Sequence, residues 1–164
     1  YKINKTSYHG GSIRVFSKLK SKNYKYSTNL ELSRMINLEE KLKLFEKKTY
    51  IKFMKTIHKK KIKLLKSILN YKSKGYKIVG IGAAAKANTF INYIGLNSLI
   101  VDFVTDSSKH KVGKFTPLSR IPIYKDEKLK NLNKVCAILF AWNISNILKE
   151  KIKKINNKVI FLNF

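Results

Sequence analysis

The sequence contains one cysteine, Cys136, among its 164 residues. A lone cysteine excludes an internal disulfide framework and a metal site built from several cysteines. Its apolar surroundings predict a buried, unreactive thiol. No apolar run approaches the roughly 20 residues that a membrane-spanning helix needs, and the first residues, YKINKTSYHGG, lack the pattern of a signal peptide. We therefore expect a cytoplasmic protein with no membrane partner.

Acidic residues and arginines are both scarce. Nine Asp and Glu stand against 36 Lys and Arg, which gives a net charge of +27 at pH 7. Such a charge attracts nucleic acid through counterion release. However, only three of the basic residues are arginines, although arginine binds phosphates and bases in the better geometry. The lysines are spread along helical patterns, which favours solvated helix faces over a dedicated nucleic-acid partner.

What the chain does have is enough apolar sequence for a core, since hydrophobic residues make up 44% of it. The pattern predicts a short strand within 11–19 and a polar connector over 21–37. Apolar residues then recur at helical spacing over 38–71, as one long helix or two, and Gly75 stands where a C-terminal cap is expected.

The second half alternates between short apolar strands and helical patterns. Strands are predicted at 77–82, 99–106, 120–124, 135–142 and 158–164, and helices at 84–95, 126–132 and 144–155. Strands rich in Val, Ile and Leu between helices indicate a parallel sheet covered on both faces. We predict an α/β fold: a Rossmann-like parallel sheet flanked by helices, preceded by a strand and a long helical segment.

The segment VGIGAAAKANTF joins the first strand of this sheet to a helix. Gly80 and Gly82 stand at the carboxyl end of the strand, where open α/β sheets bind ligands. The N–H groups of the following helix favour an anion, and Lys86 adds a positive charge about one turn into it.

The same turn lacks one feature of a dinucleotide site. Ala85 stands at the position of the third glycine, whereas Asp102 and Asp106 flank the end of the next strand, where such folds place the acid that holds a ribose. A nucleotide site and a purely structural turn both remain open, and NAD is possible but not favoured.

Five segments occur in the order and spacing of one family: HGGSIRVF, TYIKF, GIGAAAKANTFINYIG, DSSKHKVGKFTPLSRIPI and FAWN. Over essentially its whole length the chain resembles the C-terminal region of sugar C-methyltransferases, which act on nucleotide-linked keto-deoxysugars. In that family a zinc-binding segment and a domain that binds S-adenosylmethionine come first, and neither a paired CxxC nor a second glycine-rich turn is present here.

The resemblance implies the substrate-binding and base-supplying part of a C-methyltransferase that depends on S-adenosylmethionine. We expect it to be inactive alone, because the N-terminal domain that holds the methyl donor is its necessary partner. The chain then divides into the end of a preceding catalytic region with a connector (1–37), a helical linker (38–75) and a Rossmann-like substrate-binding domain (76–164). The partner ligand is a nucleoside-diphosphate sugar.

The resemblance also assigns catalytic roles near the N-terminus. Methylation next to a ketone requires removal of a C–H proton by a base, and His9 matches the histidine of the family's His-Gly-Gly-Ser motif. Gly10 and Gly11 let the backbone approach the substrate, and Ser12 hydrogen-bonds the ketone or His9. Tyr8 stands where many relatives have an acidic or polar partner. From the residues alone, His9 is a surface histidine in a turn.

By the same resemblance, a set of residues around the sheet edge binds the substrate. Lys86 and Asn88 face the diphosphate or nucleotide, and Trp142 either stacks on a base or sugar or packs against the core. Leu118 stands where the family usually has glycine, which predicts an altered loop path. The full substrate-binding set comprises Gly10, Gly11, Gly80, Gly82, Lys86, Asn88, Asp106, Lys111, Lys114, Trp142 and Asn143.

Two other classes of function remain open. One is a free-standing nucleotide-binding or NAD-binding module, and the other is a basic interaction protein that uses the fold only as a scaffold. Preference for a nucleoside diphosphate over NADH separates the first from the methyltransferase hypothesis. Steeply salt-dependent binding of nucleic acid, without binding of any small ligand, favours the second.

Overall fold

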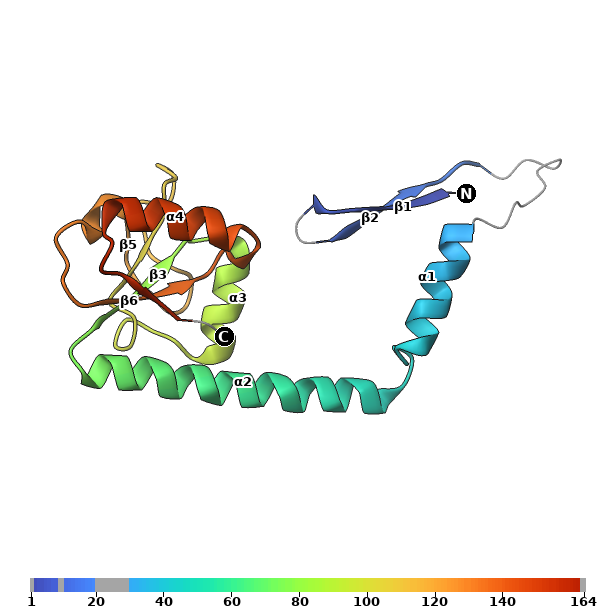
Figure 1. Cartoon of the computed structure of the whole chain (residues 1–164), viewed down its shortest axis with the longest axis horizontal. Coiled ribbons are helices and arrows are strands. Elements are labelled where there is room, and N and C mark those ends of the chain that lie inside the picture. Colours follow the sequence, from blue (N-terminus) through green and yellow to red (C-terminus); the bar gives the residue numbers. More distant parts are fainter. Residues whose placement is uncertain (1, 9–10, 20–29, 163–164) are drawn as a thin grey trace. The chain divides into compact units, whose positions relative to one another are not determined.

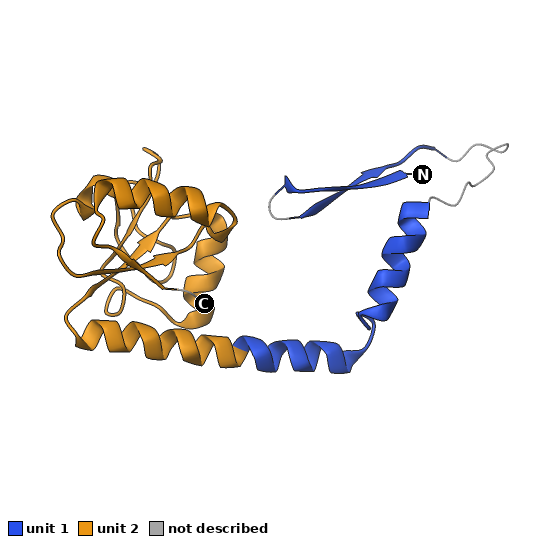
Figure 2. Ribbon diagram, viewed as in Figure 1, with its two compact units in different colours: residues 1–57 blue, residues 58–164 orange. Residues whose placement is uncertain are grey.

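The computed structural model describes residues 2–8, 11–19 and 30–162 (Figure 1). The chain forms two compact units, Tyr1–Ile57 and His58–Phe164 (Figure 2). In the first unit, strands β1 (Lys2–Thr6) and β2 (Ser12–Phe16) pair as an antiparallel hairpin. Sequence reasoning found β2 but missed β1, because the polar segment KINKT carries no alternating apolar pattern of its own.

Two helices follow, α1 (Leu30–Lys41) and α2 (Lys47–Ser73). The prediction of a polar connector over 21–37 is therefore wrong from Leu30 onward, while residues 20–29 lie outside the described part. Glu31 in the first turn of α1 pairs with Arg34 at 3.8 Å, an i,i+3 contact that supports a helix despite its polar composition. Between the helices, the Tyr50 hydroxyl donates to the Leu44 carbonyl at 2.7 Å.

The first unit has no core of its own among its described residues. No side chain of α1 is buried, and large apolar residues along 30–54 stay exposed, including Leu30, Phe45 and Phe53. A two-stranded hairpin with so little burial is marginally stable at best in water. The stability of the chain therefore resides in the second unit.

The second unit contains a five-stranded parallel sheet in the order β5-β4-β3-β6-β7. Its strands are β3 (Lys77–Ile81), β4 (Phe103–Thr105), β5 (Ile123–Tyr124), β6 (Val135–Leu139) and β7 (Ile160–Phe161). All four strand pairs are parallel, which confirms the predicted fold class. The strand order reverses between β3 and β6, where Ile81 pairs with Leu139.

Helices cover both faces of this sheet, because alternate residues of each strand point to opposite sides. Ile78 of β3 packs with Leu64 and Ile68 of α2 and with Ile91 of α3 (Ala85–Ile94). Val79, the next residue, packs on the other face. That face is covered by α4 (Ser145–Ile155) and by the 3-10 helix η2 (Asp126–Leu129), which replaces the longer helix predicted over 126–132 (Figure 1).

Cys136 lies in the centre of this core, within β6. Burial raises the pKa of its thiol to about 11, so the thiol stays protonated near neutral pH. This confirms the expectation of a buried cysteine. Separately, no helix of the described residues is long and apolar enough to span a bilayer.

Deleting residues 1–57 should leave the cooperative thermal unfolding of the remaining chain nearly unchanged. The described residues of that segment bury no side chain, whereas Leu64 and Ile68, at 3% and 0% exposure, stay in place. Circular dichroism of residues 58–164 measures the transition. As a control, removing residues 1–75 also takes away Leu64 and Ile68, and the transition should then be lost or fall steeply. Loss of the transition in the shorter deletion would show that the first unit carries stability.

Candidate functional site

The turn from β3 into α3 depends on Gly82. Its φ of 89° is the left-handed conformation that glycine adopts without strain. Its N–H donates to the Thr105 carbonyl at 2.7 Å, and a Cβ at this position would lie 3.2 Å from the Ala141 Cβ. Gly82 therefore allows the turn to pass close to the carboxyl ends of both neighbouring strands.

Gly80, the other glycine of the turn, lies inside β3. A Cβ here would lie 2.1 Å from a ring carbon of Phe140, which is fully buried. The absence of a side chain at position 80 makes room for this ring. Packing thus accounts for glycine at this position, and its contact with a ligand stays a prediction.

The first turn of α3 is open at the carboxyl edge of the sheet. Ala84 is the N-cap residue and provides no side-chain hydrogen bond to the helix. A helix start that lacks a side-chain cap keeps backbone N–H groups that favour an anionic acceptor. This geometry agrees with the anion site that the glycine turn predicts.

Asp106 fastens the loop after β4 to this helix start. Its Oδ2 accepts the Ala83 N–H at 2.8 Å, its Oδ1 accepts the Ser108 N–H at 2.8 Å, and the Lys111 ammonium lies 3.3 Å from Oδ2. The side chain is only 12% exposed. Protein donors thus engage both carboxylate oxygens, so Asp106 holds the loop after β4 against the start of α3.

Asp102 has a different place from the one expected. It directly precedes β4 at the amino end of the strand, and its Oδ2 accepts the Ile78 N–H at 2.8 Å. The expectation that Asp102 flanks the ligand edge is therefore wrong. The error arose because β4 begins only at Phe103, after a turn in which the Val101 N–H bonds to the Asn97 carbonyl.

A hollow of about 270 Å³ opens beside the first turn of α3. It is lined by Ala83, Ala85, Asn88, His110, Lys111, Lys114, Phe115, Thr116, Pro117 and Ile123. Three residues predicted to bind substrate meet here: Asn88, Lys111 and Lys114. Lys114 forms no ion pair with any described residue. The hollow is thus a basic site with an apolar wall.

Sequence reasoning missed His110, Phe115 and Thr116 as lining residues. The sequence feature that could have identified them is their position in the same segment as Lys111 and Lys114. A hydrogen bond from the Gly113 N–H to the Ile123 carbonyl, 2.9 Å long, holds this segment against β5. Leu118 adopts a φ of 61°, a left-handed conformation that glycine adopts with less strain than leucine.

The remaining predicted residues of this edge lie on the other side of α3. Lys86 and Phe90 share one helix face, and their side chains contact Trp142 at the start of the 3-10 helix η3 (Trp142–Ile144). The Lys86 ammonium lies 5.5 Å from the indole centroid. Asn143 is exposed beside it. The helix therefore separates Lys86 and Trp142 from the basic hollow.

Of the predicted catalytic residues, Tyr8 and Ser12 lie in the described part of the first unit. His9 and Gly10 lie outside the described residues. The Ser12 hydroxyl donates to the Tyr8 carbonyl at 2.9 Å, and the Gly11 N–H donates to the same oxygen at 3.1 Å. Ser12 is thus bonded within its own turn, and the catalytic roles stay predictions.

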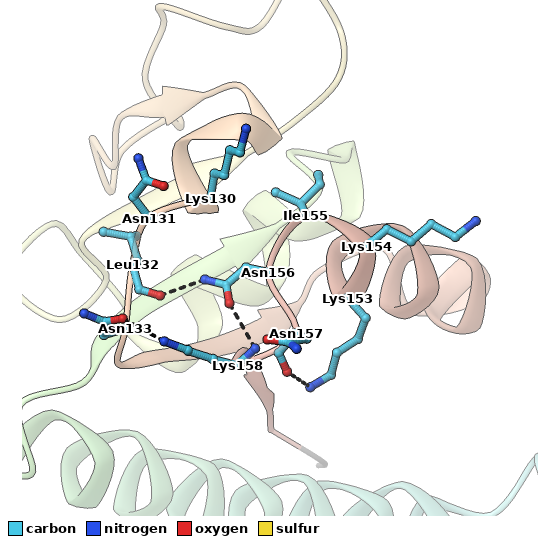
Figure 3. Close-up of a pocket in the computed structure, with 10 residues that line it drawn as sticks. All are labelled: Lys130, Asn131, Leu132, Asn133, Lys153, Lys154, Ile155, Asn156, Asn157 and Lys158. Atoms are coloured by element: carbon cyan, nitrogen blue, oxygen red, sulfur yellow. Dashed lines mark hydrogen bonds between the residues drawn. The ribbon is translucent and has the colours of Figure 1, made fainter.

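A second hollow, of about 500 Å³, lies at the opposite, amino edge of the sheet (Figure 3). Buried Asn156 shapes it by donating to the carbonyls of Leu129 and Leu132. The Lys153 ammonium donates to the Asn157 carbonyl and the Lys158 ammonium to Asn133 Oδ1, while Lys130 and Lys154 extend in different directions (Figure 3). These positive charges do not converge, so the hollow is a poor anion site compared with the one beside α3. In the described part of the chain, no cluster of His, Cys, Asp or Glu could hold a metal ion.

The parallel sheet, its order reversal and the glycine turn define a Rossmann-like α/β domain with a basic site at the carboxyl edge. The profile of the C-methyltransferase C-terminal domain family matches residues 7–161, and the chain belongs to this family. It is 26% identical over 141 residues to C-methyltransferase NovU of Streptomyces niveus. That match covers 86% of this chain and 33% of the relative, so the chain spans about a third of the relative's length.

Proposed function

We propose that this chain is the substrate-binding and base-supplying part of an S-adenosylmethionine-dependent C-methyltransferase that acts on a nucleotide-linked keto-deoxysugar. The observation that carries the proposal is the basic hollow beside the start of α3. Family membership supports the reaction class, and the hollow supports an anionic substrate.

The chemistry of the hollow suits a diphosphate. Lys111 and Lys114 provide positive charge, and the Asn88 amide provides a neutral hydrogen-bonding group. The first turn of α3 adds its backbone N–H groups from the same side. Phe115 and Pro117 form an apolar wall against which a deoxysugar ring can pack. Together these groups bind the diphosphate and leave the sugar next to it.

The described residues of this site do not fit S-adenosylmethionine itself. Its sulfonium is a cation, and Lys111 and Lys114 repel a cation at short range. The nearest acid, Asp106, is engaged by protein N–H groups. We therefore assign the methyl donor to the N-terminal domain of the same enzyme, which is the partner of this chain.

The exposed apolar residues of the first unit support such a partner. Leu30, Phe45 and Phe53 are 64%, 79% and 58% exposed, and apolar side chains of this size gain stability when another surface covers them. In this proposal the donor domain covers them and supplies the methyl group. His9 removes the proton next to the ketone, and Tyr8 and Ser12 are the other proposed catalytic residues.

Calorimetric titration tests the proposal. Uridine diphosphate or thymidine diphosphate should bind saturably to the full chain, more tightly than NADH, and with a weaker salt dependence than heparin, a nonspecific polyanion. Lys111→Ala/Lys114→Ala should weaken this binding about tenfold or more. Lys130→Ala/Lys154→Ala makes the same charge change at the amino edge and should leave it unchanged.

Equal losses of affinity in the two double variants would show that net charge alone causes the binding, which would contradict the proposal. Tighter binding of NADH would instead support the dinucleotide module. The variant His9→Ala should bind uridine diphosphate normally. After reconstitution with a donor domain it should transfer no methyl group, and unchanged turnover would remove His9 from the mechanism.

A further inference from the structure

We infer that Trp142, with Lys86 beside it, forms a stacking subsite for the nucleobase, separate from the diphosphate hollow. This inference rests on the proposed function and names which part of the ligand each side of α3 takes. The position of Trp142 in the sheet is the first observation that supports this subsite. It lies three residues after the end of β6 at Leu139, beside the point where the strand order reverses. Open α/β sheets bind their ligands at this reversal.

The indole of Trp142 is half exposed yet supported from behind. The residue is 45% exposed, and the Phe90 ring contacts the indole at 6.3 Å between centroids with a 52° tilt. Phe90 packs in turn on buried Phe140, at 5.8 Å. Core packing therefore holds the indole in place without covering it. A supported aromatic ring that keeps an open side is suited to stacking.

Lys86 gives this platform its charge. Its ammonium lies 5.5 Å from the indole centroid, and the residue belongs to the first turn of α3, next to the open helix start. The ammonium lies over the indole ring, so it is close to any base that stacks there. From this position the cation can attract a phosphate that passes over the first turn of α3 on its way from the base to the hollow.

The size of the diphosphate hollow supports a second subsite. Its volume is about 270 Å³, below the roughly 300–1,000 Å³ of sites that enclose a drug-sized ligand. The hollow can therefore enclose only part of a nucleoside-diphosphate sugar. A helix is about 10 Å across with its side chains, a width that a diphosphate-linked ligand can bridge. The supported aromatic surface on the other side of α3 is Trp142.

Trp142 is the only tryptophan of the chain, so tryptophan fluorescence, excited at a wavelength that the nine tyrosines do not absorb, reports on this site alone. Uridine diphosphate should quench the fluorescence of the full chain saturably, whereas pyrophosphate should bind with little quenching. Calorimetry of Trp142→Leu should show uridine diphosphate affinity lowered about tenfold and pyrophosphate affinity unchanged. Trp142→Phe should retain most of the affinity, since a smaller ring still stacks. Unfolding curves of both variants check that the fold is intact.

These binding measurements distinguish the base subsite from the diphosphate site on which it depends. If both ligands bind equally well and Trp142→Leu changes neither affinity, the base subsite is wrong and the diphosphate site stands. If Lys111→Ala/Lys114→Ala weakens both ligands while Trp142→Leu weakens only uridine diphosphate, both are supported. If neither ligand binds saturably, the proposed function fails and the base subsite with it.

Discussion

Replacing Gly80 with alanine should lower the free energy of unfolding by about 2–3 kcal/mol. The added Cβ would lie 2.1 Å from a ring carbon of Phe140, and that ring is fully buried. A terminal side-chain atom at the surface could move aside, but a ring inside the core moves only with its neighbours. Urea unfolding followed by circular dichroism measures the loss.

Gly95→Ala is the matched control, because Gly95 lies in the same unit and a Cβ added there would have no atom within 4 Å. Unlike Gly80, Gly95 has a left-handed φ of 86°. Its cost should be limited to backbone strain, about 1 kcal/mol. In the background of Gly80→Ala, a second change of Phe140→Leu should recover part of the loss, since it removes the clash. Equal losses for Gly80→Ala and Gly95→Ala would show that the ring does not need the space.

Replacing Asp106 with alanine should lower both stability and ligand affinity. Two partly buried N–H groups, those of Ala83 and Ser108, lose their acceptor, which should cost about 2–3 kcal/mol. Uridine diphosphate affinity should fall about tenfold or more, because Lys111 loses the partner that holds it. Charge alone predicts the opposite sign, since removing an anion strengthens the binding of another anion. The sign of the affinity change therefore separates a positioning role from a simple charge effect.

Asp126 provides the control for this variant. It is 6% exposed and pairs with Lys151, but it belongs to η2 and lines no part of the hollow. Asp126→Ala should lower stability and leave uridine diphosphate affinity unchanged. Asp106→Asn keeps one oxygen acceptor and should fall between wild type and Asp106→Ala in both measurements. Tighter binding in Asp106→Ala would contradict the positioning role.

The sheet could be predicted because its strands are runs of apolar residues with strong local signals. Predicted segments such as 77–82 and 135–142 contain β3 and β6 almost unchanged. The structure of the first unit was harder to predict, since β1 depends on its pairing with β2 and α1 on weak polar contacts. Neither β1 nor α1 is therefore specified by a hydrophobic pattern within its own segment.

Gly80 illustrates a different limit. Its place in a glycine turn indicated a ligand contact, whereas the space it leaves is filled by Phe140, a residue far along the chain. No local pattern carries that information. By contrast, the separation of Lys86 from Asn88 was available in the sequence. Two residues apart on a helix means about 200° of rotation, so the two side chains had to face opposite sides of α3.

Asn88, Lys111 and Lys114 met at one hollow because carboxyl ends of parallel strands share one edge of the sheet. That edge rule made the hollow predictable in outline. The hydrogen bonds of Asp106 were not predictable, since the exact path of two loops decides which N–H groups donate to its carboxylate. The contact of this acid with substrate stays a prediction, whereas its hydrogen bonds with the Ala83 and Ser108 N–H groups were not expected.

The central claim is that the carboxyl edge, beside α3, is where this protein binds its anionic substrate. Amide chemical-shift mapping of the ¹⁵N-labelled chain with uridine diphosphate tests it most directly. The account predicts saturable shifts confined to residues 82–88, 106–116 and 142–143. Shifts concentrated at residues 130–133 and 153–158, around the hollow of the opposite edge (Figure 3), or spread evenly over the lysines, would contradict it.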